Sequence, residues 1–139
     1  MYSQFREITL KNFERYEKGE IMMLVAEANN FPVGQAYIDL VKRGEESIGV
    51  IWSLRVLENL QNLGIGTRLI KSAEKFLESK GFGIAEIAVE KDNPNAKRIY
   101  ERLGYHVVRD EIDEWDYTTP EGKKVHVVSH EWIMHKPLD

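Results

Sequence analysis

The stretch from Ile48 to Ile70 constrains the fold of this chain more than any other. It begins with an apolar, β-branched run, crosses a polar segment with two glycines two residues apart, and continues with helical periodicity. This order predicts a strand, a turn and the first turns of a helix. Gly64 and Gly66 lack a Cβ, so the backbone there can adopt unusual dihedral angles and approach a bulky group closely.

A turn of this kind is suited to binding an anion. The first amide groups of the helix, near Gly66 and Thr67, have no intrahelical acceptor and lie at the positive end of the helix dipole. A phosphate is their natural ligand. The glycines match neither common nucleotide motif, because Leu69 replaces a third glycine and Thr67 replaces the P-loop lysine. The alternative is that the two glycines only form a tight turn.

Composition narrows the class of protein. The 139 residues, with a net charge of -4 and no cysteine, fit one domain over residues 1–139 with a real core. The lack of cysteine excludes disulfides, thiol nucleophiles and zinc fingers. Interspersed charges without a basic stripe argue against nucleic acid as a partner. Without a signal-peptide core or a long apolar run, we expect a soluble cytoplasmic protein with no membrane partner.

The first half of the chain predicts mainly strands. Residues 4 to 9 suggest a short strand, and apolar positions three residues apart suggest a helix from Leu10 to Lys18 that ends at Gly19. Strands over 21–28 and 31–41 are expected to form a hairpin at Asn29 and Asn30. A turn over 44–46 and a strand over 47–56 complete this part.

The second half alternates helices and strands. The helix after the glycines is amphipathic and ends at Gly81, with apolar Leu69, Ile70, Ala73, Phe76 and Leu77 opposite charged Lys71, Glu74, Lys75 and Glu78. A strand over 82–90 follows, and then a helix capped at Asp92–Pro94 that ends at Gly104. Strands over 105–112 and 124–135, with a turn over 120–122, end the chain. The pattern predicts a mixed sheet with helices on its faces.

Three segments in this order resemble the acetyl-CoA-binding core of the GNAT superfamily of N-acetyltransferases. They are Leu54–Val56, the glycine segment, and NPNAKRIYERLGY from Asn93 to Tyr105. The family patterns Gln/Arg-x-x-Gly-x-Gly/Ala, Asn-x-x-Ala-x-x-x-Tyr and Gly-Phe/Tyr are matched by Gln61, Gly64, Gly66, Asn93, Ala96, Tyr100, Gly104 and Tyr105. The resemblance covers about residues 21 to 112. It implies an α/β (α+β) fold with about seven mostly antiparallel strands, splayed between the fourth and fifth, and helices on both faces.

The resemblance also implies how acetyl-CoA, the co-substrate, is bound. The amides from Asn62 to Thr67, that is Asn62, Leu63, Gly64, Ile65, Gly66 and Thr67, would cradle the pyrophosphate, and Gln61 would shape that loop. Leu54, Arg55 and Val56 would offer backbone groups to the pantetheine arm, so the identity of Arg55 is free. Asn93 would hold the pantetheine or the incoming amine. No metal is expected.

The resemblance assigns the chemistry to Tyr100. Acyl transfer from a thioester expels a thiolate, to which a phenol can donate a proton. The alternative is that Tyr100 is an ordinary inner-face aromatic residue. The family's frequent base, a glutamate on the strand before the loop, is missing, so the base stays unassigned with Asp39 and Glu90 as candidates. The implied mechanism is direct attack, with a backbone N–H such as that of Val56 polarising the carbonyl.

The acceptor is expected to be a small-molecule or peptide amine. The short N-terminus leaves its pocket either open or completed by a second subunit, which allows a homodimer. The segment from Asp110 to Tyr117, DEIDEWDY, predicts a solvated acidic loop or, alternatively, a lip that attracts a cationic amine. Tyr37 and Trp52 either line the same pocket or pack in the core.

Two further alternatives stay open. His126 and His130, four residues apart in a strand-like segment, would be about 13 Å apart, too far to share a metal ion. A non-catalytic acyl-CoA-binding or regulatory module would keep the loop and lose the chemistry. Asn93 and Tyr100 favour an enzyme.

Overall fold

The computed structural model describes residues 8–14 and 19–139, which form seven strands and two α-helices. The chain divides into two compact units. The first comprises Met1–Glu86 with Pro137–Asp139, and the second comprises Ile87–Lys136. No helix among the described residues has the length and apolar character needed to cross a membrane.

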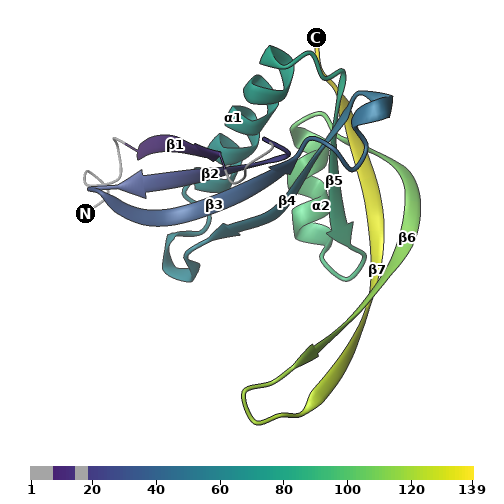
Figure 1. The fold of residues 1–139 in the computed structure, drawn as a ribbon. Coiled ribbons are helices and arrows are strands. Elements are labelled where there is room, and N and C mark those ends of the chain that lie inside the picture. The colour runs from purple at the N-terminus through teal and green to yellow at the C-terminus, as the bar shows by residue number, and fades with distance from the viewer. Residues whose placement is uncertain (1–7, 15–18) are drawn as a thin grey trace. The chain divides into compact units, whose positions relative to one another are not determined.

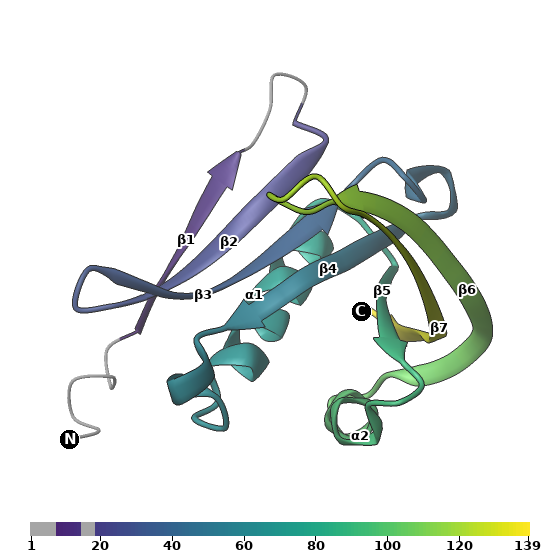
Figure 2. The same cartoon turned by 90° about the horizontal axis from the view of Figure 1, so that it is seen from below.

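The first unit is built on an antiparallel sheet (Figures 1 and 2). Its strands β1 (Ile8–Glu14), β2 (Ile21–Ala28), β3 (Phe31–Asp39) and β4 (Ile48–Val56) pair in that order. Asn29 and Asn30 join β2 to β3 with φ of 54° and 66°, the left-handed conformation that a two-residue hairpin requires. The predicted hairpin is therefore confirmed.

The predicted helix over 10–18 is wrong where the structure describes it. Residues 10–14 belong to β1, in which Leu10 is paired with Ala26 and Phe13 with Met23. Pairing with β2 supplies the backbone hydrogen bonds, and this long-range gain outweighs a weak helical spacing. Residues 4–7 and 15–18, which the same prediction covered, lie outside the described residues.

Helix α1 (Ile65–Ser79) packs on β2, β3 and β4. The core of this unit consists of buried side chains from both layers, including Leu24, Ala36, Ile38, Ile51, Leu69, Ile70, Ala73 and Leu77. The packing is close at Gly49 of β4, where a Cβ would lie 2.2 Å from Leu77 Cδ2. Burying each leucine contributes about 1.5–3 kcal/mol.

The predicted faces of α1 need one correction. Glu74, expected on the solvent side, is only 8% exposed, and Phe76, expected in the core, is half-buried. The buried arc of α1 includes positions 70, 73, 74 and 77, which follow the i, i+3, i+4 and i+7 spacing. Leu77 therefore packs beside Glu74 on that arc, and Phe76 lies at its edge.

The second unit contains the rest of β5 (Ile84–Glu90), α2 (Pro94–Arg102), β6 (His106–Thr118) and β7 (Lys124–Pro137). In the strand order, β7 lies between β5 and β6. The buried side chains of the second unit near the start of β6 and in β7 include Tyr105, Ile133 and Met134. The mixed, mostly antiparallel fold with about seven strands is as predicted, whereas the splay between the fourth and fifth strands stays a prediction.

The predicted acidic loop over 110–117 is also wrong. Residues 110–117 continue β6, and pairs from Asp110 with Trp132 to Tyr117 with Val125 join them to β7. Five acids in eight residues disfavour a strand by local propensity. The alternating cross-strand partners on β7 nevertheless keep the backbone extended.

Candidate functional site

The C-terminal end of β4 leads into the predicted anion-binding loop. After Val56 the chain passes through a short 3-10 helix, Glu58–Leu60, and reaches α1 at Ile65. Leu57 N donates to Val33 O at 3.0 Å, and Gln61 Nε2 donates to Val56 O at 3.2 Å. Gln61 therefore holds the loop against its own strand. Its part in a pyrophosphate site, which the resemblance implies, stays a prediction.

The backbone of this loop leaves a run of donors without acceptors. Among the described residues, no backbone hydrogen bond is donated by the amides of residues 62–67, and Arg68 N is the first to bond back, to Gly64 O at 3.1 Å. Gly64, the N-cap of α1, has no side chain that could cap these donors. Residues 62–64 are exposed, Gly66 and Thr67 are half-buried and Ile65 is buried, so the start of this run of donors lies at the surface, where it can bind an anion.

Two loop residues have left-handed backbones, Asn62 at φ 66° and Gly64 at φ 85°. Gly66 differs, because a Cβ there would lie 3.8 Å from Val56 Cγ2, an ordinary contact. The left-handed backbone therefore favours glycine at 64, whereas neither the packing nor the backbone conformation requires glycine at 66. Ile65, which is 1% exposed, anchors the start of α1 in the core.

A bulge interrupts β4 just before this loop. Arg55 pairs with Gln35 and Trp52 with Tyr37, so two residues of β4, at positions 53 and 54, oppose one residue of β3. Ser53 absorbs the extra residue with φ 53°, a left-handed conformation inside a strand. A bulge leaves a residue out of the ladder and redirects the neighbouring backbone groups, here at Leu54.

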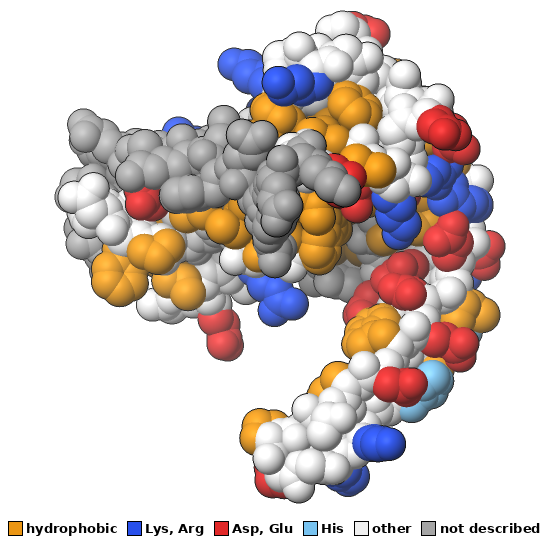
Figure 3. All heavy atoms as spheres, in the orientation of Figure 1, with side chains coloured by type: hydrophobic (Ala, Val, Ile, Leu, Met, Phe, Trp, Pro, Cys, Tyr) orange, Lys and Arg blue, Asp and Glu red, His pale blue; other side chains and the backbone are white. Residues whose placement is uncertain are grey.

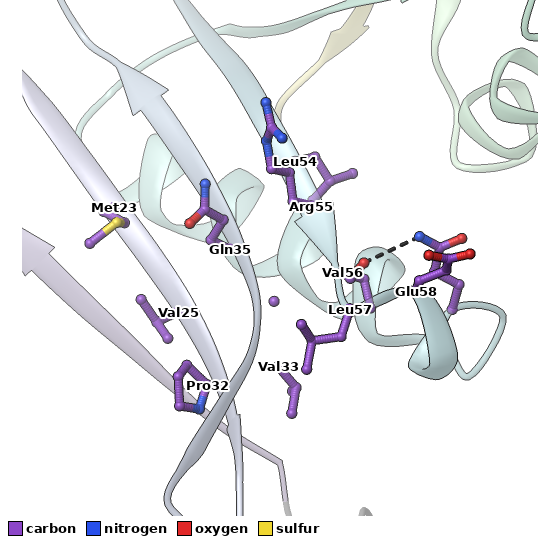
Figure 4. Close-up of a pocket in the computed structure, with 12 residues that line it drawn as sticks. Met23, Val25, Pro32, Val33, Gln35, Leu54, Arg55, Val56, Leu57 and Glu58 are labelled. Carbon is purple, nitrogen blue, oxygen red and sulfur yellow. Dashed lines mark hydrogen bonds between the residues drawn. The ribbon is translucent and has the colours of Figure 1, made fainter. Parts of the chain in front are cut away.

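A cleft of about 670 Å³ lies beside the end of β4 (Figure 4). It is lined by the predicted residues Leu54, Arg55, Val56 and Gln61, together with Met23, Val25, Pro32, Val33, Gly34, Gln35, Leu57 and Glu58. The lining is mostly apolar, with Arg55 and Glu58 as its charged groups among the described residues. Sequence reasoning missed the contributions of β2 and β3, because only the register between strands brings them to β4.

Tyr37 and Trp52 form an edge-to-face pair with ring centroids 4.8 Å apart. Trp52 is 41% exposed, so it is not a core residue. Neither residue lines the cleft beside Arg55. Of the two alternatives for this pair, the fully packed core is therefore excluded for Trp52.

In the second unit, Asn93 caps α2. Its Oδ1 accepts a hydrogen bond from Ala96 N at 3.2 Å, and Pro94 follows in the first turn. The helix start predicted at Asp92–Pro94 is thus confirmed, with Asn93 as the N-cap and Pro94 as the first helical residue. Because the side-chain oxygen is used by the cap, the amide nitrogen of Asn93 is the part that can contact a ligand.

Tyr100 lies on the half-buried face of α2, 6.3 Å from the ring of Tyr105. Burial raises the pKa of the Tyr100 phenol above its ordinary value, so the hydroxyl is protonated at neutral pH. None of the described residues hydrogen-bonds this hydroxyl. Tyr100 is therefore both protonated and able to donate.

The two candidate bases have different surroundings. Asp39 Oδ1 accepts from Val41 N and Lys42 N, each at 2.9 Å, and so stabilises the turn after β3. Glu90, at the end of β5, accepts from Ser129 Oγ at 3.4 Å. Asp39 is thus occupied by a structural role, and Glu90 is the freer carboxylate of the two.

The histidines of β7 do not gather ligands for a metal. His126 Nδ1 lies 2.6 Å from Asp116 Oδ1, whereas His130 pairs with Ile112 in the strand register. Among the side chains described in residues 19–139, no group of three or more His, Asp or Glu is placed to hold a metal ion.

The chain was compared with known proteins. A family model described as "Acetyltransferase (GNAT) family" matches residues 2–105. No curated protein matches the chain at a significant level.

Solved structures share the fold. An IAA acetyltransferase from Bacillus cereus ATCC 14579 aligns with a TM-score of 0.75 and 14% identity over 95% of this chain and 100% of that chain. The ribosomal-protein-S18-alanine N-acetyltransferase from Escherichia coli aligns with a TM-score of 0.71 and 17% identity, over 96% of this chain and 95% of that chain. The PaiA N-acetyltransferase from Thermoplasma acidophilum was solved in complex with coenzyme A. It aligns with a TM-score of 0.62 and 19% identity, over 85% of this chain and 61% of that chain.

The matched family model spans the β4–loop–α1 segment and the helix that carries Asn93 and Tyr100. The structures just described share its fold. This chain belongs to the GNAT acetyltransferase family.

Proposed function

We propose that this protein transfers an acetyl group from acetyl-CoA to a primary amine by direct attack in a ternary complex. The observation that carries the proposal is the run of amides from residue 62 to residue 67 without acceptors, at the N-terminus of α1. Such donors, with the helix dipole behind them, suit the pyrophosphate of coenzyme A.

The surroundings of the loop support the rest of the coenzyme site. Leu54, Arg55 and Val56 follow the bulge at Ser53, where the backbone leaves regular pairing with β3. We propose that their backbone groups hold the pantetheine arm as an additional strand would. The N–H of Val56 is proposed to polarise the thioester carbonyl.

Tyr100 is proposed to protonate the leaving thiolate. In this step the neutral amine nitrogen forms a bond to the carbonyl carbon, the carbon–sulfur bond breaks, and the phenol proton passes to sulfur. The nitrogen then releases one proton through solvent, and this proton restores the phenol. A phenol is protonated at neutral pH at its ordinary pKa of about 10, and burial raises the pKa of Tyr100 further, so the hydroxyl has a proton to donate. The absence of cysteine from the whole sequence is consistent with direct attack without a thioester on the enzyme.

The amine must also lose a proton, since an ammonium has no lone pair. Glu90 is the proposed acceptor of that proton, directly or through water, because Asp39 is engaged in its turn. The acceptor itself is not set by the fold. Structures with this fold include enzymes named for a ribosomal protein and for nourseothricin.

Two measurements test the proposal. Calorimetry with coenzyme A should register binding, and a thiol reagent should detect release of free coenzyme from acetyl-CoA with at least one member of an amine panel. Binding without thiol release by any amine would favour the alternative, a non-catalytic acyl-CoA-binding module. No binding heat at saturating coenzyme would contradict both.

A further inference from the structure

A row of side chains from three strands of the first unit crosses the sheet at the cleft beside β4. Arg55 is paired with Gln35, and Gln35 is paired with Val25. Directly paired residues share a face of the sheet, and the row spans two strand spacings, about 10 Å. Leu24 and Ala36, which alternate with the half-buried Val25 and Gln35, are buried in the core with α1. The row therefore lies on the face of the sheet opposite α1.

The cleft along this row is lined mainly by apolar side chains. Figure 4 shows Leu57 across the cleft from Val25 and Pro32. Leu57 is 47% exposed. In Figure 3, hydrophobic side chains gather at the left of the molecule, over the end of the sheet where β2 turns into β3. A concave surface with exposed apolar side chains is typical of a site that binds an apolar ligand.

The volume and the charge of the cleft limit what can fill it. Its volume of about 670 Å³ lies within the range of about 300–1,000 Å³ that is usual for sites of small ligands. Among the described residues that line it, the charged ones are Arg55 and Glu58, which have opposite signs. The cleft therefore favours no ligand group of a particular charge, whereas its apolar walls favour a hydrocarbon chain.

The end of β4 connects this cleft to the coenzyme. Leu54, Arg55 and Val56 are proposed to hold the pantetheine arm, and all three also line the cleft. Because that arm ends in the thioester, the acyl group of a bound thioester begins at the β4 side of the cleft. Acetyl adds one methyl group beyond the carbonyl and leaves most of the row unfilled. An octanoyl chain, with C–C bonds of about 1.5 Å, extends about 9 Å and spans it.

We propose that this cleft holds the acyl chain of a coenzyme A thioester, and that the protein prefers unbranched apolar acyl groups longer than acetyl, such as octanoyl. The carbonyl stays at β4, and the chain runs past Gln35 toward Val25. The bonds that form and break are those of acetyl transfer, since only the group on the carbonyl carbon differs. The inference rests on the proposed function for the position of the thioester.

Calorimetry without an amine tests the inference directly. Each methylene that leaves water should tighten binding by up to about fourfold, so octanoyl-CoA should bind at least about tenfold more tightly than acetyl-CoA. Butanoyl-CoA and hexanoyl-CoA should fall between them. Succinyl-CoA, which matches butanoyl-CoA in carbon number but ends in a carboxylate, should bind less tightly than butanoyl-CoA. Equal affinities for acetyl-CoA and octanoyl-CoA, or tighter binding of succinyl-CoA than of butanoyl-CoA, would overturn the proposal.

A matched pair of variants locates the chain. Val25→Trp fills the far end of the cleft and should reduce the ratio of octanoyl-CoA to acetyl-CoA affinity at least about fivefold. Val41→Trp makes the same change at a side chain that is 54% exposed after β3, outside the described lining of the cleft. It should leave the ratio as in wild type. An unchanged ratio in Val25→Trp would mean that the chain lies elsewhere, which contradicts the proposal.

Two further measurements complete the test. Circular dichroism checks that each variant is folded, and the smaller change Val25→Phe, with the same expected direction, replaces Val25→Trp if that variant is not. Hexylamine, titrated without coenzyme, asks whether an apolar acceptor occupies the cleft instead. Binding of hexylamine that Val25→Trp abolishes would identify the acceptor as the occupant and overturn the proposal.

Thiol release separates this inference from the proposed function. If octanoyl-CoA binds more tightly than acetyl-CoA but no amine releases thiol from either thioester, the acyl site stands and the proposed function fails. If amines release thiol from acetyl-CoA while the two thioesters bind equally well, the proposed function stands and this inference fails.

Discussion

Gly64 is the residue at which the backbone of the loop is most constrained. Gly64 has φ 85°, and a Cβ added there would meet no atom within 4 Å. An alanine at this position would therefore lose only the free energy of holding a non-glycine residue in the left-handed conformation, about 1–2 kcal/mol. We therefore expect Gly64→Ala to lower both the melting temperature and the affinity for coenzyme A.

The matched variant is Gly66→Ala, for which the protein has room. It should leave the melting temperature unchanged and weaken coenzyme binding alone, as measured by calorimetry. If both variants bind coenzyme A like wild type, the loop does not hold the pyrophosphate.

Tyr100 allows a test of the chemical step. Tyr100→Phe removes the hydroxyl and keeps the ring, so coenzyme affinity should be preserved while kcat falls by about 10²–10⁴, the usual range for general acid catalysis. Because burial raises the pKa of Tyr100 above about 10, the rate should not lose its proton donor below that pH. A kcat equal to that of wild type would remove the assigned role.

Glu131 makes stability depend on pH. Its pKa is raised in the folded state, so the folded chain binds this proton more tightly than the unfolded chain. Burial and the charges of Asp113, Glu90 and Glu111 disfavour the ionised carboxylate. Their cost is fully present above the raised pKa and is relieved as the pH falls toward the ordinary glutamate value.

Glu131→Gln should therefore stabilise the protein at pH 7, by up to about 1 kcal/mol for one opposed like-charge pair. The gain should shrink as the pH drops. Thermal melts across pH are the measurement, and a gain that persists unchanged at acidic pH would contradict this explanation.

At the scale of the element, α2 depends on its cap. Asn93→Ala removes the acceptor for Ala96 N and should destabilise the protein by about 1 kcal/mol. Asn93→Asp keeps a capping oxygen, and melting temperatures of the two variants should differ accordingly. If Asn93→Asp restores stability but not turnover, the amide of Asn93 also contacts a substrate. Equal melting temperatures for both would rule out the cap as the source of stability.

The elements that sequence reasoning identified are those defined by local signals. The Asn29–Asn30 hairpin, the helix after Gly64 and the cap at Asn93 each depend on residues close in the chain. Residues 10–14 of β1 and the outer part of β6 were missed because their partners lie in other strands. Local propensity cannot anticipate such pairing.

The site divides in the same way. Gln61 and the glycines of the loop were assigned to the site through the resemblance, in which their spacing is joined by the pattern from Asn93 to Tyr105. The cleft side chains Met23, Val25 and Gln35 were not, because strand register sets which residues of β2 and β3 border β4. The bulge at Ser53 left no sequence signal that we could use, since serine is common in strands and turns alike.

At the scale of the whole molecule, charge guides the choice of acceptor. The chain carries a net charge of -4, and Asp113, Glu114 and Asp116 of β6 are exposed. A cationic amine should therefore be attracted, and the attraction between exposed charges weakens as salt shortens the screening length to about 8 Å at physiological ionic strength.

We expect KM for a cationic acceptor to rise with added salt, while KM for a neutral hydrophobic amine stays nearly constant. Steady-state kinetics over a salt series provides the comparison. An anionic acceptor preferred over a cationic one would contradict the expectation.

The close contact between Gly49 of β4 and Leu77 of α1 limits how this fold can be redesigned. Because Leu77 fills the space that any side chain at position 49 would need, β4 and α1 have to be exchanged together. If β4 alone is transferred into a relative, the transferred Gly49 leaves a void wherever the relative's helix has a side chain smaller than leucine. If α1 alone is transferred, Leu77 clashes with any side chain at the position that corresponds to 49.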